Sequence, residues 1–269
     1  MMTAPYRFIT IAASHYCDKA RWALDRAGIA YVEDGHLPIA HLRVTLPLRL
    51  ETGRKDVRGT PCLVRGTEVW PDSTDILHHI DTTLPEEQRL FPADPQLRAA
   101  VVHWEERCDE DLGPHARRLA YWHVLPHREI ALQALRTGVP AWEVALVRAL
   151  FPLAARGIRK TLNITAASAE RSLAKVRALF AEASAALEAN LPDGSGHAWL
   201  VGDKMSAADI AFAALAAPVL LPESHPFMRS SLETTPPAFA ELVREFRGTA
   251  AGAHGLRMYA DERGRAVAR

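Results

Sequence analysis

The chain has 269 residues, of which 48% are hydrophobic, which is enough apolar material for one large domain or two ordinary ones. Lysine plus arginine and aspartate plus glutamate each total 32, so no strong net charge recruits a nucleic acid or an anionic membrane. The three cysteines, Cys17, Cys62 and Cys108, form no C-x-x-C pair and predict reduced thiols instead of a disulfide framework.

Two segments bear on the compartment of the protein. The longest uncharged apolar run, 210–221, contains Pro218 and is shorter than the roughly 20 residues of a membrane-spanning helix. The N-terminal residues place Arg7 inside their first apolar stretch and do not follow the pattern of a signal peptide. We therefore expect a cytoplasmic protein.

Residues 1–82 alternate short apolar runs with helical patterns, and this alternation predicts an α/β domain of thioredoxin size. The order is βαβ followed by ββα, whereas residues 36–58 have no clear pattern. The predicted elements are strands at 6–13, 29–35, 61–66 and 68–70, and helices at 16–27 and 73–81.

The remainder of the chain predicts an all-α domain over 96–269, joined to the first by a proline-containing linker at 83–95. Alanine- and leucine-rich segments with helical spacing predict its helices. These segments are 97–112, 141–160, 169–191 and 206–217. The tail 260–269 is expected to fray.

Ser14 and Cys17 open the first predicted helix. Apolar residues recur at helical spacing over 16–27, and Gly28 then ends the helix. Ser14 is therefore the best candidate for the N-cap, with Cys17 in the first turn. A capping hydroxyl contributes about 1 kcal/mol, and the local pattern by itself favours this structural role.

Four motifs together resemble the cytosolic glutathione S-transferases. They are S-x-x-C-x-K-A-R from Ser14, G-T-P-C-L from Gly59, the pair Asp72–Ser73 before a helix, and GDKMSAADIA from Gly202. The resemblance implies a thioredoxin-like N-terminal domain, an all-α C-terminal domain, glutathione as co-substrate and a homodimer. It also implies that Ser14 stands where a serine-type member meets the glutathione sulfur.

The chemistry of a thiol is consistent with that role for Ser14. A free thiol has a pKa of about 8.5, and lowering it by two units requires roughly 2.7 kcal/mol. A hydroxyl hydrogen bond to a charged acceptor supplies about 1.5–3 kcal/mol, and a helix N-terminus adds a fraction more. Cys17 is the alternative, because a cysteine in the first turn of a helix can form a mixed disulfide with glutathione.

The resemblance also assigns the residues that bind glutathione. Thr60–Pro61 corresponds to a cis-proline turn whose main chain pairs with the cysteinyl amide of glutathione. Asp72 and Ser73 correspond to the pair that holds the γ-glutamyl carboxylate at a helix N-terminus. Taken without the resemblance, Pro61 predicts a trans proline that begins a strand, and either Asp72 or Ser73 predicts only a helix cap.

In the second domain, Ser206 and Asp209 predict a capping box whose role is folding, with Met205 and Ile210 as a hydrophobic staple. The histidines lack the spacing of a metal site, so we expect no metal. Aromatic residues are candidates for lining a pocket for a small hydrophobic electrophile, although core positions are more common for them. They are Trp104, Tyr121, Trp122, Trp142 and Phe151.

Three functions agree with the sequence. The first is a glutathione transferase-like enzyme in which Ser14 stabilises the thiolate that attacks the electrophile. The second is a glutathione-dependent thiol-disulfide oxidoreductase that uses Cys17. The third is a non-catalytic glutathione-binding or scaffold protein with the same fold.

Overall fold

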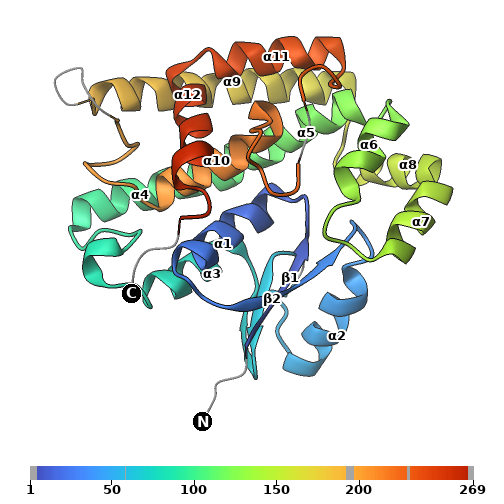
Figure 1. Ribbon diagram of the computed structural model, residues 1–269, viewed down its shortest axis with the longest axis horizontal. Helices are drawn as coiled ribbons and strands as arrows, with labels where there is room; N and C mark the ends of the chain where they lie inside the picture. Colours follow the sequence, from blue (N-terminus) through green and yellow to red (C-terminus); the bar gives the residue numbers. More distant parts are fainter. Residues whose placement is uncertain (1–4, 58, 192–196, 229–230, 266–269) are drawn as a thin grey trace.

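A four-stranded mixed sheet forms the centre of the N-terminal domain in this computed structural model, which describes residues 5–57, 59–191, 197–228 and 231–265 (Figure 1). The strand order is β2-β1-β3-β4, with β1 parallel to β2 and β3 antiparallel to both of its neighbours. The strands are β1 Tyr6–Ile11, β2 Tyr31–His36, β3 Cys62–Arg65 and β4 Glu68–Trp70.

Helices cover both faces of this sheet because successive residues of a strand point to opposite sides. Phe8 packs into the main core with α1 and α3, whereas Ile9 packs into a smaller cluster with Leu48 of α2. The three helices are α1 His15–Arg26, α2 Leu42–Thr52 and α3 Ser73–Asp81. This arrangement confirms the predicted thioredoxin-like domain, and α2 occupies the segment that the sequence left unassigned.

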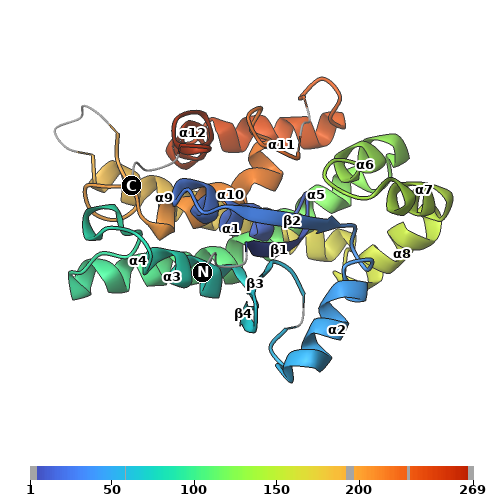
Figure 2. The ribbon, with the colours of Figure 1, turned by 60° about the horizontal axis from the view of Figure 1, so that its bottom comes forward.

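Residues 95–262 form the predicted helical domain, and the described part of this range contains no strand. Its centre is α10, whose residues are buried throughout and which packs against α1, α4 and α5 (Figure 2). The 3-10 helix η1 Glu86–Gln88 precedes this domain. The elements of the domain are α4 Pro95–Arg107, the π-helix η2 Cys108–Leu112, α5 Gly113–Val124, α6 Arg128–Leu135, α7 Ala141–Ala149, α8 Phe151–Thr161, α9 Ala166–Ala189, α10 Ala207–Leu220, α11 Pro237–Arg247, α12 Ala250–Arg257 and the π-helix η4 Met258–Glu262.

Two predictions in this domain were wrong. The segment 141–160 is two helices, because Pro152 has no N–H with which to continue the α7 hydrogen-bond ladder, and the chain turns at Leu150. The expected fraying at 260–269 does not begin at residue 260. Arg263 is bonded to Asp18 and Asp25 of α1 at 3.1 and 2.7 Å, and residues 266–269 lie outside the described residues.

The predicted capping box at the start of α10 is confirmed. Asp209 Oδ2 accepts from the N–H of Ser206 at 2.9 Å, and the Ser206 hydroxyl donates to the same oxygen. Asp209 Oδ1 also accepts from the N–H of Leu200 at 2.9 Å and lies 3.1 Å from His254 Nε2. The fully buried Asp209 therefore joins three segments of the helical domain.

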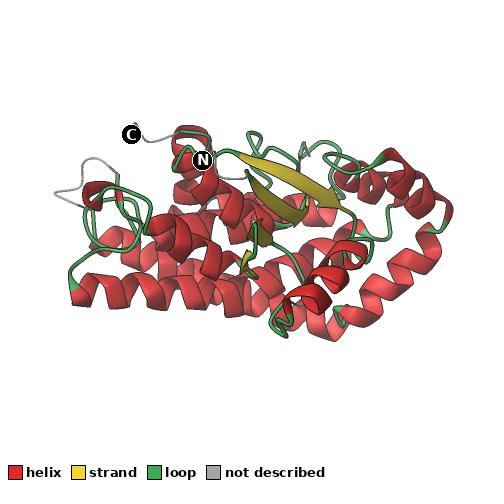
Figure 3. Cartoon of the chain, turned by 90° about the horizontal axis from the view of Figure 1, so that it is seen from below, coloured by secondary structure: helices red, strands yellow, loops and turns green. Residues whose placement is uncertain are grey.

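The helices α6, α7 and α8 form one end of the molecule, where they lie near α2 (Figure 3). Glu143 of α7 connects this end to the sheet, because its carboxylate accepts from His36 Nδ1 and from the N–H of Leu37, both at 2.8 Å. Within the described residues, no helix has the length and apolar character needed to cross a bilayer.

Candidate functional site

Ser14 occupies the turn between β1 and α1. Its N–H donates to the carbonyl of Ile11 at 2.8 Å, and its own carbonyl accepts from the N–H of Asp18 at 2.9 Å. Ser14 has the extended backbone of an N-cap residue (φ −77°, ψ 127°), but its hydroxyl makes no capping hydrogen bond. The helix therefore uses the main chain of Ser14 and leaves its hydroxyl available for another role.

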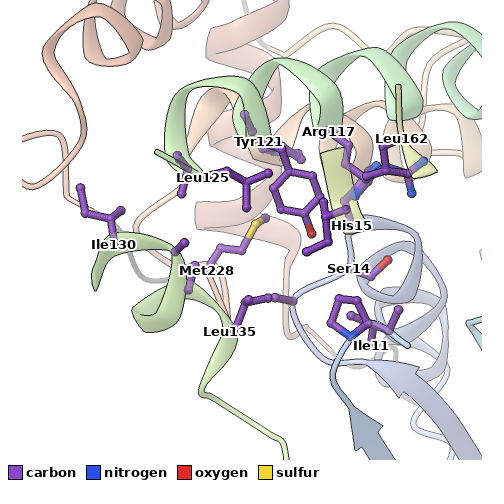
Figure 4. Close-up of a pocket in the computed structure, with 18 of the residues that line it drawn as sticks. Ile11, Ser14, His15, Arg117, Tyr121, Leu125, Ile130, Leu135, Leu162 and Met228 are labelled. Carbon is purple, nitrogen blue, oxygen red and sulfur yellow. The ribbon is translucent and has the colours of Figure 1, made fainter. Parts of the chain in front are cut away.

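The Ser14 side chain lies in the wall of a cavity of about 470 Å³ between the two domains (Figure 4). Most of the wall is apolar, with contributions from the β1–α1 turn, the loop before α2, and the helices α5, α6 and α8. The labelled wall residues are Ile11, Ser14, His15, Arg117, Tyr121, Leu125, Ile130, Leu135, Leu162 and Met228.

Polar groups in the cavity wall concentrate near the N-terminus of α1. His15 is buried and lies 3.0 Å from the carbonyl oxygen of Gly113 through Nε2. Burial, reinforced by the Arg117 guanidinium, lowers the pKa of His15 to about 3, so the imidazole is neutral at pH 7. Arg117 has no carboxylate partner among the described residues, and it therefore supplies positive charge at this end of the cavity.

Tyr121 projects from α5 into the cavity (Figure 4). Its hydroxyl has no hydrogen-bond partner among the described residues, and burial raises its pKa while Arg117 opposes that rise. The hydroxyl is therefore protonated at neutral pH and can donate to a molecule in the cavity.

Cys17 lies one turn along α1 from Ser14 and is completely buried, outside the cavity wall. Burial raises the pKa of its thiol, and this effect exceeds the opposing effects of Arg21 and of contacts with the Ser14 and Thr60 hydroxyls. At neutral pH Cys17 is therefore a buried thiol. The peptide bond between Thr60 and Pro61 is cis, and the turn brings Thr60 next to Cys17.

The helix α3 begins at Ser73, directly after Asp72. Asp72 is the N-cap, and its carboxylate accepts from the N–H of Asp75 at 2.8 Å. Ser73 is 3% exposed, and its hydroxyl has no hydrogen-bond partner among the described residues. The N–H groups of Ser73 and Thr74 are likewise unbonded in the part of the chain that the structure describes, as is normal for a first helical turn.

A buried ionic network, which the sequence reasoning missed, fixes α1 against α3. Lys19 Nζ contacts Glu105, lies 2.7 Å from the carboxylate oxygens of Asp109 and donates to Thr74 Oγ1 at 3.3 Å. Thr74 in turn donates to both carboxylates. The network holds the beginnings of α1 and α3 in a fixed relation, with Ser14 at one and Ser73 at the other.

Among the aromatic candidates from the sequence, only Tyr121 lines the cavity. Trp104 and Phe151 are buried in hydrophobic clusters, Trp122 is half-buried, and Trp142 is exposed. The described residues contain no group of three or more side chains arranged to hold a metal ion.

Comparisons with known proteins agree with this architecture. Residues 8–88 match the family model of the glutathione S-transferase N-terminal domain, and residues 148–228 match that of the C-terminal domain. A search of curated protein sequences found no match.

Solved structures share the fold at low sequence identity. Ure2p in complex with glutathione is 15% identical, with 96% of this chain and 95% of that chain covered and a TM-score of 0.56. The beta-etherase LigF from Sphingobium sp. strain SYK-6 is 18% identical, with coverages of 94% and 99% and a TM-score of 0.54. A Methylobacterium radiotolerans glutathione S-transferase in complex with glutathione sulfonate is 19% identical, with coverages of 99% and 97% and a TM-score of 0.51. The fold and the two matched domains place this chain in the cytosolic glutathione S-transferase superfamily.

Proposed function

We propose that this protein is a glutathione transferase in which Ser14 stabilises the glutathione thiolate and the cavity holds an apolar electrophile. The observation that carries the proposal is the position of Ser14, which stands at the N-terminus of α1 and also in the wall of a largely apolar cavity. Glutathione complexes among proteins of the same fold support the choice of co-substrate.

The groups around Ser14 are suited to an anionic sulfur. The Ser14 hydroxyl is not used by the helix, the α1 N-terminus presents its positive dipole end, and Arg117 adds a cation. A hydroxyl hydrogen bond to a thiolate contributes about 1.5–3 kcal/mol, which lowers a thiol pKa by about one to two units. The neutral His15 adds no opposing or competing charge.

Cys17 is better suited to a positioning role than to nucleophilic attack. Its thiol is inaccessible and its pKa is raised, whereas a nucleophilic cysteine needs exposure and thiolate character. The Ser14 hydroxyl is in contact with the Cys17 sulfur, so the buried side chain of Cys17 helps to position the serine. This arrangement favours conjugation over disulfide exchange.

The remaining parts of the site fit the peptide portion of glutathione. We assign the Thr60 main chain, which lies beside Cys17 at the cis-proline turn, to the cysteinyl amide. The Ser73 hydroxyl and the unbonded N–H groups at the start of α3 suit the γ-glutamyl carboxylate, whereas the Asp72 carboxylate already caps the helix. The homodimer stays a prediction.

Tyr121 is the donor that we assign to the electrophile. Its hydroxyl is protonated, unpartnered among the described residues and directed into the cavity. A donor at this position stabilises negative charge that develops on an electrophile oxygen during attack. The preferred substrates are then apolar molecules whose reactive carbon is conjugated to a carbonyl or nitro group.

One experiment tests the proposal. Calorimetric titration with glutathione is combined with a conjugation assay on wild-type protein and on Ser14→Ala. We expect the wild-type protein to bind glutathione and to turn over, with turnover strongly reduced in the variant. Wild-type binding without turnover of any electrophile supports the non-catalytic alternative, and absence of binding refutes both enzyme hypotheses.

A further inference from the structure

Large exposed apolar side chains gather on one part of the surface. Among the described residues ten such side chains are exposed, and seven of them belong to α2, to the loop before it, or to the segment of α7 and α8. We call this surface the α2–α7 face. Its apolar residues are Ile39, Leu46, Leu50, Trp142, Leu146, Leu150 and Leu153.

The two parts of the α2–α7 face meet at Arg43 and Trp142. On α7, Trp142, Leu146 and the small residues Ala145 and Ala149 recur at helical spacing and form one exposed stripe. The Arg43 guanidinium of α2 lies 4.7 Å from the centre of the Trp142 ring, so the two helices meet there. An apolar helix stripe normally packs into a core, and its exposure here indicates a binding surface.

The helices that carry this apolar surface also carry an excess of cations, although the whole chain has no net charge. The range 141–160 has four basic residues and one carboxylate, and that carboxylate, Glu143, is buried and already bonded to β2. None of the six cations has a carboxylate partner among the described residues. They are Arg43, Arg49, Arg148, Arg156, Arg159 and Lys160.

We propose that the α2–α7 face docks on an anionic phospholipid membrane. Exposed leucines and a tryptophan flanked by arginine and lysine are the composition of a helix that lies in the membrane interface. A second copy of the chain is a poorer occupant, because a two-fold contact brings together two faces that each have six cations, and the exposed carboxylate within α2, α7 and α8 is Glu51. The total charge of the chain, from which we expected no recruitment to an anionic membrane, does not reveal this local concentration of cations.

The α2–α7 face adjoins the cavity. Ile39 is 61% exposed and also lines the cavity, and its backbone has φ 76°, an unusual conformation for a β-branched residue. The loop before α2 therefore holds the Ile39 side chain outward, at the border between the cavity and the α2–α7 face. If the proposed function is correct, docking brings the cavity next to apolar electrophiles dissolved in the membrane.

Vesicle co-sedimentation tests the docking without reference to activity. The vesicles are phosphatidylcholine alone and an equimolar mixture of phosphatidylcholine and phosphatidylglycerol. We expect wild-type protein to bind the mixed vesicles at least tenfold more tightly, and the double variant Leu146→Glu/Leu150→Glu to lose that binding. Leu97→Glu, at an exposed position on α4, is the matched control and should bind as wild type does.

A second variant keeps the test decisive if the double variant does not fold. Arg156→Gln/Lys160→Gln removes two exposed cations and should weaken binding to the mixed vesicles by roughly 10- to 30-fold. Failure of wild-type protein to bind the mixed vesicles overturns the proposal. A wild-type dimer that Leu146→Glu/Leu150→Glu converts to monomer, without vesicle binding, also overturns it and assigns the face to chain–chain contact.

Discussion

Ser14 lies in the cavity wall, and its hydroxyl contacts the thiol of Cys17, which is completely buried one turn further along α1. If Ser14 hydrogen-bonds the thiolate, Ser14→Ala should raise the pKa of bound glutathione by about one to two units. Conjugation at pH 7 should then fall about 10- to 100-fold and partly recover at higher pH. Thiolate absorbance and a pH–rate profile measure both effects.

The matched variant is Cys17→Ala, which should retain glutathione binding and most of the conjugation activity. A modest loss is consistent with its contact to the Ser14 hydroxyl. The opposite pattern, with activity abolished by Cys17→Ala and spared by Ser14→Ala, contradicts the assignment and supports the oxidoreductase.

Ser73→Ala should weaken glutathione binding, because the hydroxyl at the start of α3 is assigned to the γ-glutamyl carboxylate. The expected loss is roughly 1.5–3 kcal/mol in calorimetric titration. The helix cap is Asp72, so the stability of α3 should change little, and a thermal melt serves as the control. An unchanged affinity removes Ser73 from the site.

Tyr121→Phe tests the donor in the cavity. For an electrophile with a conjugated carbonyl, kcat should fall roughly tenfold, because one hydrogen bond to developing negative charge is lost. The glutathione dissociation constant should not change, since the hydroxyl acts on the second substrate. A parallel loss of glutathione affinity indicates that Tyr121 belongs to the glutathione site instead.

Asp209→Ala should destabilise the protein by about 3 kcal/mol, more than the removal of an ordinary cap, because it leaves the buried N–H groups of Leu200 and Ser206 without an acceptor. The matched control is Asp94→Ala, which removes the exposed N-cap of α4 and should cost about 1 kcal/mol. Denaturant unfolding measures both values. Equal losses in the two variants would mean that the buried contacts of Asp209 add nothing.

Stability should fall as the pH decreases from 7.5 to 5. Burial lowers the pKa of His15 to about 3 and that of His225 to about 4, so the unfolded chain binds more protons in this range. Each buried imidazole should contribute a loss of about 2 kcal/mol by pH 5. His225→Gln should remove about half of the combined decrease, and identical pH profiles for variant and wild type contradict this account.

The sequence predicted the elements that depend on local patterns. The helix 73–81 was placed correctly because Asp72 caps it and its apolar residues recur at helical spacing. The helix α2 was not predicted, because it contains Pro47 and its leucines show no clear helical periodicity. Its exposed leucines do not follow the pattern of a helix that faces a core.

Features that depend on contacts distant in sequence were not predictable. Lys19 reads as an ordinary surface cation of a helix, yet it is buried against Glu105 and Asp109, about 90 positions away. Tyr121 resembled the other aromatic candidates, and only the folded chain separates it from them by placing it in the cavity.

Asp18 shows how the two ends of the chain depend on each other. This fully buried carboxylate of α1 accepts from the hydroxyl of Tyr259 at 2.6 Å and from Arg263 at 3.1 Å. In a fragment that ends after the first domain, Arg21 is its main remaining partner, and a poorly compensated buried charge is costly. The buried polar contacts of the N-terminal domain therefore include residues of η4 and Arg263. We expect a fragment that contains this domain alone to fold poorly, and the two domains to unfold together.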